Sequence, residues 1–231
     1  MDLKRFFTDK PIDEYAYLYG QEFTHAVKVV RLKVGYKLIV CRGDDKDYYC
    51  TVEEITKEYL KAKVDEIKHN DTEIGRNVTL YIGLNKDIDT VVQKAVELGV
   101  TEIVPFTSQH SNVDKINKQR LETIVTESSK QCGRSRLATI SDPIRFSEIG
   151  KDNETIFAFY EFERSNKVSE IPLPEGDIGI VIGSEGGFSV EEYQTMLDKK
   201  FFVLTLGKRI LRVSTAVVSA LTLVNERIGE L

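Results

Sequence analysis

Over the first 70 residues, hydrophobic and polar positions follow the two-residue period of half-buried β-strands. In YLKAKVDEI, residues 59–67, apolar side chains at 60, 62 and 64 alternate with charged ones at 61, 63 and 65. The stretch KLIVCRG, residues 37–43, runs into the turn signal GDDK and then into DYYCTVEEI. These patterns predict a small β-barrel or sandwich. The polar, turn-rich stretch HNDTEIGR, residues 69–76, marks the domain boundary, which divides the chain into residues 1–72 and 73–231.

After this boundary the pattern changes to strands that alternate with helices. Helices are predicted where apolar residues recur with the helical period, at residues 87–99, 114–131 and 214–226. Near-continuous apolar runs are typical of strands that helices cover on both faces. They predict strands at NVTLYIGL, TEIVPF, TIFAFY, IGIVIG and FFVLTLG. The second part of the chain is therefore predicted to be an α/β domain with a mostly parallel sheet.

A glycine-rich turn, GSEGG at residues 183–187, connects one of these strands to a predicted helix. This layout places backbone N–H groups at a ligand, but neither the dinucleotide fingerprint nor the Walker sequence is present. Ser189 and Glu192 form a predicted capping box that occupies the helix N-terminus, and Glu185 would repel a phosphate. The turn therefore fits a phosphate-free, nucleoside-like ligand that can carry positive charge. The alternative is a plain tight turn with a solvent-facing glutamate.

A second loop, LTLGKRILRVSTA at residues 204–216, also leaves an apolar strand through a glycine. It carries Lys208, Arg209 and Arg212 before Ser214 or Thr215 can cap the last helix. Successive strand ends of a parallel sheet meet at its carboxyl edge, where α/β domains bind ligands. The acidic glycine turn and this basic loop are therefore expected to lie side by side there.

Composition and charge exclude several classes of protein. The 231 residues are 41% hydrophobic and 30% charged, with no run of 18 apolar residues and no signal-peptide core, which predicts a cytoplasmic chain without a membrane span. The net charge of −5 argues against nonspecific coating of nucleic acid, but leaves room for a local basic stripe. The cysteines and histidines lack the spacing of disulfide frameworks or metal sites, so we expect no bound metal. They are Cys41, Cys50, Cys132, His25, His69 and His110.

Several segments together resemble one protein family. IGSEGGFS is similar to that family's IGPEGGFS, and LGKRILRVSTA is similar to its LGxRILRxETA. The segments HAVKVVRLKVGYKL, VVQKAVELGV, KQCGR and IPLP fall in the family's order, so the resemblance covers nearly the whole chain. The family is that of the bacterial 16S ribosomal RNA uridine-N3 methyltransferases (RsmE), within the SPOUT superfamily.

The resemblance implies a fold, an activity and partners. Residues 1–72 would form a PUA-like, RNA-binding β-barrel, and residues 73–231 a SPOUT-type α/β methyltransferase domain with a trefoil knot. The protein would be a homodimer that uses S-adenosyl-L-methionine to methylate N3 of one uridine in 16S rRNA within the small ribosomal subunit. This methyl donor is a phosphate-free nucleoside with a sulfonium cation, which is the kind of ligand that the glycine turn predicts.

The resemblance also implies site residues. Three strand-end loops would bind the cofactor, Arg212 would contact and activate the target base, and basic side chains would contact RNA phosphates. The expected cofactor-binding residues are Phe159, Tyr160, Gly183, Glu185, Gly186, Leu206, Gly207, Ile210 and Leu211. The expected RNA contacts are Lys28, Arg31, Lys33, Lys130, Arg134 and Arg136. The plain alternatives are a surface ion pair for Arg212 and a solvated charged face for the other basic residues.

The sequence departs from the family pattern at three positions. Ser184 replaces a proline, and Val213 and Ser214 replace a Thr-Glu pair, which removes a carboxylate from the third loop. No residue is assigned as the general base. Two other functions stay open: a related SPOUT methyltransferase that acts on another RNA such as tRNA, and a nonenzymatic RNA-binding protein of the same fold.

Overall fold

The computed structural model describes residues 3–111, 113, 115–151, 153–174 and 176–230. By packing, the chain divides into two units. The first runs to Glu73 and also contains Thr126–Leu137, and the second contains Ile74–Val125 and the chain from Ala138 onward. The predicted division into residues 1–72 and 73–231 assigns the segment Thr126–Leu137 to the second domain, whereas packing groups it with the first.

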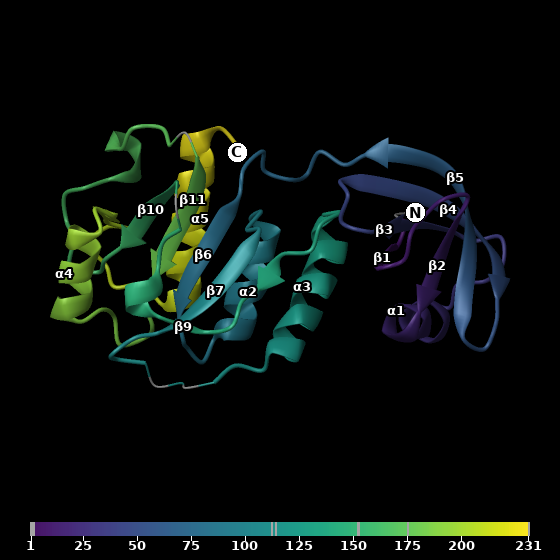
Figure 1. The fold of residues 1–231 in the computed structure, drawn as a ribbon, viewed down its shortest axis with the longest axis horizontal. Helices are drawn as coiled ribbons and strands as arrows, with labels where there is room; N and C mark the ends of the chain where they lie inside the picture. The colour runs from purple at the N-terminus through teal and green to yellow at the C-terminus, as the bar shows by residue number, and fades with distance from the viewer. Residues whose placement is uncertain (1–2, 112, 114, 152, 175, 231) are drawn as a thin grey trace. The chain divides into compact units, whose positions relative to one another are not determined.

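The first unit is built on a five-stranded sheet with the order β1-β3-β4-β5-β2. β1 is parallel to β3, and all other neighbours are antiparallel. Figure 1 shows these strands in purple and blue. They are β1 (Arg5–Phe7), β2 (Tyr15–Tyr19), β3 (Lys37–Cys41), β4 (Lys46–Ile55) and β5 (Tyr59–His69), with α1 (Gly20–Thr24) and a π-helical turn (His25–Val29) after β2.

The alternation predicted for β5 is confirmed, because Leu60 and Ala62 are fully buried while Lys63 is exposed. Two register shifts between β4 and β5 interrupt the ladder, and such bulges bend a strand and increase its twist. The Thr8 hydroxyl, just beyond β1, donates a hydrogen bond to the carbonyl of Tyr17 in β2 (2.9 Å). This bond links the two ends of the strand order, as expected for a curled sheet. The predicted β-rich N-terminal fold is therefore confirmed.

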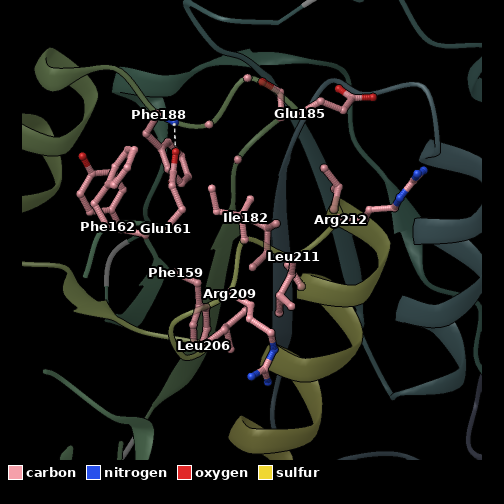
Figure 2. Close-up of a pocket in the computed structure, with 18 of the residues that line it drawn as sticks. Phe159, Glu161, Phe162, Ile182, Glu185, Phe188, Leu206, Arg209, Leu211 and Arg212 are labelled. Carbon is pink, nitrogen blue, oxygen red and sulfur yellow. Dashed lines mark hydrogen bonds between the residues drawn. The ribbon is translucent and has the colours of Figure 1, made fainter. Parts of the chain in front are cut away.

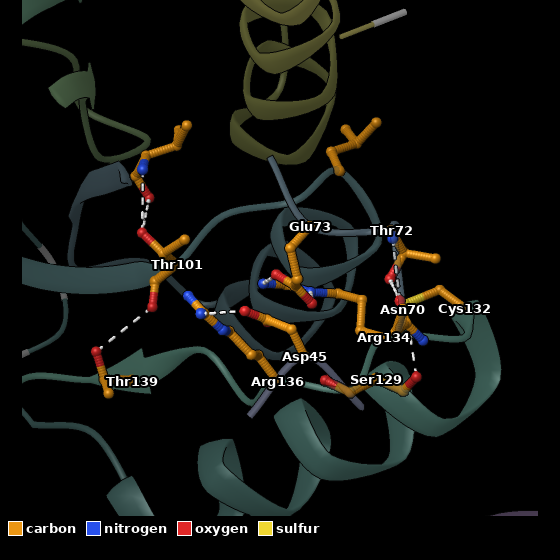
Figure 3. A network of polar contacts seen from close by, with 12 residues as sticks. Asp45, Asn70, Thr72, Glu73, Thr101, Ser129, Cys132, Arg134, Arg136 and Thr139 are labelled. Carbon is orange, nitrogen blue, oxygen red and sulfur yellow. Dashed lines mark hydrogen bonds and ion pairs between the residues drawn. The ribbon is translucent and has the colours of Figure 1, made fainter. Parts of the chain in front are cut away.

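The segment Thr126–Leu137 is attached to the rest of the first unit by ion pairs and hydrogen bonds (Figure 3). Arg134 forms a bidentate pair with Glu73, with Nη2 2.7 Å from Oε2 and Nε 3.0 Å from Oε1. Arg136 pairs with Asp45. These contacts join residues that lie 61 and 91 positions apart in the sequence. They give a physical reason why packing groups this segment with the first unit.

Lys130, in the same segment, is surrounded by acceptors. Its ammonium lies 2.6 Å from a carboxylate oxygen of Glu22, 2.9 Å from one of Glu127 and 3.4 Å from Nδ1 of His25. Glu22, His25 and Glu127 could by their spacing hold a metal ion. In this structure the Lys130 ammonium contacts all three groups, so a cation of the chain itself offsets part of the negative charge of the cluster.

The second unit is built on a parallel seven-stranded sheet with the order β12-β10-β11-β6-β7-β8, and β9 also pairs with β7 (Figure 1). The predicted α/β domain with a parallel sheet is confirmed. The strands are β6 (Val78–Gly83), β7 (Glu102–Thr107), β8 (Thr139–Ile140), β9 (Ile144–Arg145), β10 (Glu154–Phe159), β11 (Asp177–Ile182) and β12 (Phe202–Leu204). The helices are α2 (Ile88–Glu97), the first part of α3 (Lys118–Cys132), α4 (Val190–Asp198) and α5 (Val213–Ile228), with 3-10 turns at Phe146–Glu148 and Val168–Glu170. From Thr126 on, α3 belongs to the first unit.

Helices cover the sheet, as the continuous apolar strands predict. α5 contacts both α2 and β11, and the predicted stripe on α5 is buried at Val217, Leu221 and Val224. Met196 of α4 lies in a separate cluster of buried residues with Tyr81 and other strand side chains. Among the described residues no helix is long and apolar enough to span a bilayer.

Two helix boundaries differ from the prediction. α3 begins at Lys118, so Ile116 precedes it, and residue 114, the predicted start, lies outside the described residues. The prediction that Ser214 or Thr215 caps α5 is wrong, because the helix begins at Val213. Its N-cap is Arg212, which forms no capping bond through its side chain. Both hydroxyl residues therefore lie inside the first turn.

Candidate active site

The loops that follow β10, β11 and β12 meet at the carboxyl edge of the sheet and line a cavity of about 510 Å³. β10 lies between β11 and β12 in the sheet, so three neighbouring strands present their loops to the same space. Residues 183–187 and, with the exception of Lys208, residues 206–212 belong to the lining, so the two loops meet as the sequence predicts (Figure 2). The side chain of Leu211 and the glycine turn face the same space from different loops.

All nine residues predicted to bind a cofactor line this cavity, and so does Arg212. The lining combines apolar side chains, such as Phe159, Ile182 and Leu206, with the main chain of the glycine turn. Backbone donors and acceptors on an apolar wall suit a small organic ligand. Contacts between these residues and a ligand stay a prediction.

The glycines allow unusually close packing in and around the turn. Gly83, at the end of β6, lies so close to the turn that a Cβ there would overlap with the backbone nitrogen of Ser184. Gly187 has a φ of 70°, a left-handed value that favours glycine, and a Cβ there would overlap with the carboxylate of Glu161. The hydrogen bond from Gly187 N–H to the Ser184 carbonyl (3.0 Å) closes the turn.

The predicted capping box at the start of α4 is confirmed, and it also has a second role. Ser189 Oγ accepts from Glu192 N–H (3.1 Å), and the Glu192 carboxylate accepts from Ser189 N–H (2.8 Å). The same buried carboxylate accepts from the backbone N–H of Gln109, 3.0 Å away in the loop after β7. Glu192 therefore ties the loop after β7 to the segment that follows the glycine turn, a link that sequence spacing did not reveal.

The carboxylate that lies against the glycine turn is that of Glu161, not that of Glu185. The exposed Glu185 side chain turns toward the loop after β6, where it accepts from Lys86 N–H (2.8 Å). The half-buried Glu161, just beyond β10, places Oε1 3.4 Å from Phe188 N–H (Figure 2). Glu161 is not among the site residues predicted from the sequence, although its position directly after the predicted strand TIFAFY was a usable signal.

Aromatic side chains hold the loop of Glu161 in place. The rings of Tyr160 and Tyr193 stack with centroids 4.7 Å apart, and Phe162 packs edge-on against Tyr160 at 5.5 Å. Burial, aided by the neighbouring charge of Glu161, raises the pKa of Tyr160 above its ordinary value. The phenol therefore stays neutral at physiological pH.

Arg212 reaches the cavity lining from the end of the third loop. Its side chain is exposed, and in the described part of the chain no carboxylate lies within ion-pair distance of it. The alternative reading of Arg212 as one half of a surface ion pair therefore finds no partner among these residues. A guanidinium without a partner carboxylate at the edge of a cavity can bind an anion or a group that becomes one.

The residues predicted to contact RNA differ in how far their cations are exposed. Lys28, Arg31 and Lys33 are exposed, within or just after the π-helical turn of the first unit. Lys130 and Arg134 are paired with carboxylates, and only 8% and 3% of their side chains are exposed. Arg136 is intermediate, since it pairs with Asp45 while 48% of its side chain remains exposed.

Comparisons with known proteins match both parts of the chain. Residues 72–225 match the RNA methyltransferase domain family, and residues 18–65 match the RNA methyltransferase PUA domain family. Ribosomal RNA small subunit methyltransferase E of Mesomycoplasma hyopneumoniae is 30% identical over 226 residues, which cover 94% of this chain and 97% of that protein. Its counterpart in Aquifex aeolicus is 30% identical over 188 residues, covering 78% and 81%.

A solved structure is similar over the same length. The crystal structure of a ribosomal RNA small subunit methyltransferase E from Neisseria gonorrhoeae, bound to S-adenosyl methionine, superposes with a TM-score of 0.91. The two sequences are 26% identical, and the match covers 97% of this chain and 98% of the other.

Proposed function

The chain belongs to the family of ribosomal RNA small subunit methyltransferases E, and on this premise we propose that it methylates N3 of a specific uridine in 16S rRNA with S-adenosylmethionine. The observation that carries the proposal is the cavity of about 510 Å³ formed by three strand-end loops. Its lining of apolar side chains and glycine backbone fits a nucleoside without phosphates. A related protein of known structure binds this methyl donor.

The residues of the cavity fit S-adenosylmethionine, and we propose that they hold it. Phe159, Leu206 and Leu211 supply apolar surface for the adenosine part, while residues 183–187 supply backbone donors and acceptors. When bound, the cofactor supplies an electrophilic methyl group. The protein's contribution to such an in-line transfer is to align the acceptor atom and to exclude water.

Arg212 is proposed to act on the target base. Uridine N3 carries a proton and is a weak nucleophile until that proton leaves. Negative charge then spreads onto O2 and O4, and a guanidinium placed beside either oxygen stabilises it. Arg212 fits this role because it lines the cavity without a carboxylate partner among the described residues.

Analysis of ribosomal RNA from a strain that lacks the gene tests this proposal. We expect one N3-methyluridine to disappear from 16S rRNA and to return when the wild-type gene is supplied. The measurement is mass analysis of nuclease fragments of 16S rRNA and of tRNA. Loss of a tRNA modification with intact 16S rRNA would favour the related methyltransferase. Unchanged RNA together with no binding of S-adenosylmethionine would favour the nonenzymatic RNA-binding protein.

We propose that exposed basic residues of the first unit contact rRNA phosphates. Lys28, Arg31 and Lys33 have cations free to reach solvent, and Arg136 is half-exposed. Lys130 and Arg134 are assigned a supporting role, because both cations are largely buried and already paired with carboxylates. Phosphate contacts of this kind position RNA without reading its sequence.

RNA affinity is expected to fall as salt rises, because each phosphate contact releases counterions. Each of Lys28, Arg31 and Lys33 replaced by alanine should reduce the slope of log affinity against log salt by about 0.7 to 0.9. Filter binding or fluorescence anisotropy with a 16S rRNA fragment, from 50 to 200 mM salt, measures this slope. An unchanged slope in all three variants would remove these residues from the interface.

The resemblance further implies a trefoil knot and a homodimer, and we include both in the proposal. Exposed apolar side chains on α5 support a partner surface, since Val218 is 36% exposed and Leu223 43%. We also propose that the protein acts in the cytoplasm, on the small ribosomal subunit; the rRNA substrate named for its relatives supports this.

A further inference from the structure

We propose that Glu161 is the counter-ion for a cationic group of the methyl donor. This inference rests on the proposed function, because it assigns a role inside the same cavity. The donor carries two cations, a sulfonium and an α-ammonium, and a carboxylate in the lining could neutralise either.

The carboxylate of Glu161 lies against the glycine turn, residues 183–187. It is half-buried in the cavity lining and so close to Gly187 that any side chain at that position would collide with it. Among the described residues, its one side-chain hydrogen bond is the long one, 3.4 Å, from Phe188 N–H to Oε1. One long hydrogen bond compensates little of the cost of withdrawing a carboxylate from water.

No cation of the described residues pairs with Glu161. Arg164, three positions along the same loop, directs its Nη1 to the backbone carbonyls of Glu161 and Glu163 instead. Arg209 and Arg212 line the cavity, yet neither lies within ion-pair distance of this carboxylate. A partly desolvated carboxylate of this kind gains most from a positively charged ligand.

The other carboxylates of the cavity are placed differently. Glu185 is exposed and accepts from the backbone N–H of Lys86 (2.8 Å). Asp87 is exposed at the start of α2. Of the lining carboxylates, Glu161 alone is half-buried against the glycine turn.

The loop that carries Glu161 is held by several contacts. Tyr160 N–H donates to the carbonyl of Leu204 (3.1 Å), which joins the ends of β10 and β12. Glu163 Oε1 accepts from the backbone N–H groups of Arg164, Ser165 and Asn166 and so fixes the following turn. A carboxylate on such a fixed loop meets its ligand with little loss of conformational freedom.

The test replaces only the charge. Glu161→Gln has almost the same shape and keeps Oε1 as the acceptor for Phe188 N–H, so the turn is expected to remain intact. Calorimetry with three ligands separates the possible partners: S-adenosylmethionine carries both cations, S-adenosylhomocysteine only the ammonium, and 5′-methylthioadenosine neither. We expect the Kd of S-adenosylmethionine to rise about tenfold or more, as for loss of one charged contact, while methylthioadenosine changes less than about twofold.

The homocysteine product identifies which cation is bound. An unchanged Kd for S-adenosylhomocysteine assigns the sulfonium, and the enzyme would then hold the donor more tightly than its product. A Kd weakened as much as that of the donor assigns the α-ammonium. Both outcomes support the proposal.

Glu163→Gln is the matched control. It removes the same charge from the same loop, keeps the Oε1 acceptor, and lies outside the cavity lining. We expect it to leave all three affinities within about twofold, because the side chain lies outside the cavity lining and glutamine keeps the acceptor that fixes the turn. Thermal unfolding of each variant verifies that the fold is retained.

Three results would overturn the inference. One is an unchanged Kd of S-adenosylmethionine in Glu161→Gln, and another is an equal loss for methylthioadenosine, which would assign Glu161 to the neutral adenosine part. The third is an equal effect of Glu163→Gln, which would mean that any negative charge near the site has the same effect at long range.

If the wild-type protein bound none of the three nucleosides, the proposed function would fail and this inference with it. If the wild type binds the nucleosides normally and Glu161→Gln does not selectively weaken S-adenosylmethionine, only this inference is refuted and the proposed function stands.

Discussion

Replacement of Arg212 by alanine is expected to lower methyl-transfer turnover by about 100- to 1,000-fold, the usual effect of removing one donor that stabilises a developing anion. The affinity for S-adenosylmethionine should change by less than about threefold. Arg212 is assigned to the base and not to the cofactor, because it contributes an exposed guanidinium to the cavity and has no carboxylate partner among the described residues. Its role as N-cap of α5 does not depend on its side chain, so the helix should form unchanged.

Single-turnover kinetics with 16S rRNA or small subunits measures the chemical step, and calorimetry measures cofactor binding. Lys208→Ala is the control, because Lys208 is an exposed cation of the same loop that does not line the cavity. It should retain nearly full turnover. Normal turnover at saturating cofactor combined with a large loss of cofactor affinity would assign Arg212 to the cofactor instead of the base.

Replacement of Arg134 by alanine is expected to destabilise the protein by about 3 to 5 kcal/mol, the cost of removing one partner of a buried ion pair. The side chains of Arg134 and Glu73 are only 3% and 9% exposed, and their contact is bidentate. The variant would leave the Glu73 carboxylate buried without its cation. It would also weaken the attachment of Thr126–Leu137 to the first unit.

Arg136→Ala is the matched control for Arg134→Ala. Arg136 also pairs with a carboxylate of the first unit, but its side chain and that of Asp45 are 48% and 25% exposed, so the expected cost is below about 1 kcal/mol. Urea denaturation followed by circular dichroism measures both variants. Equal stability of the two would contradict the structural role of Arg134, and a selective loss of RNA affinity in Arg134→Ala would restore it as an RNA contact.

Local patterns in the sequence were sufficient for much of the fold. The alternation in residues 59–67 and the apolar runs of the second half predicted the strands, because burial on one or both faces of a sheet imposes a period on neighbouring residues. The capping box of Ser189 and Glu192 was predicted from a spacing of three, and both of its bonds are present. The cap of α5 was mispredicted because serine and threonine are favoured N-cap residues in general. The spacing of Ser214 and Thr215 did not show that the helix begins one residue earlier, at Val213.

Sequence motifs also indicated the location of the candidate site, but not the roles of all its charges. The glycine turn and the basic loop were expected to meet because successive parallel strands end at one edge, and both line the cavity. Glu185 was predicted to be the carboxylate at the glycine turn because it lies within the GSEGG motif. The carboxylate that lies against Gly187 comes instead from Glu161, in a different loop.

The sequence by itself determined the order and type of most elements, the capping box and the family, because each depends on residues within a few positions of one another or on the order of short motifs. Only the tertiary structure decided which charges face a cavity, which are exposed and which are buried in pairs. Glu185 bonds to Lys86, 99 positions away, and Arg134 pairs with Glu73, 61 positions away. The environment of a charge is set by whichever segments fold against it, and those contacts leave no local period in the sequence.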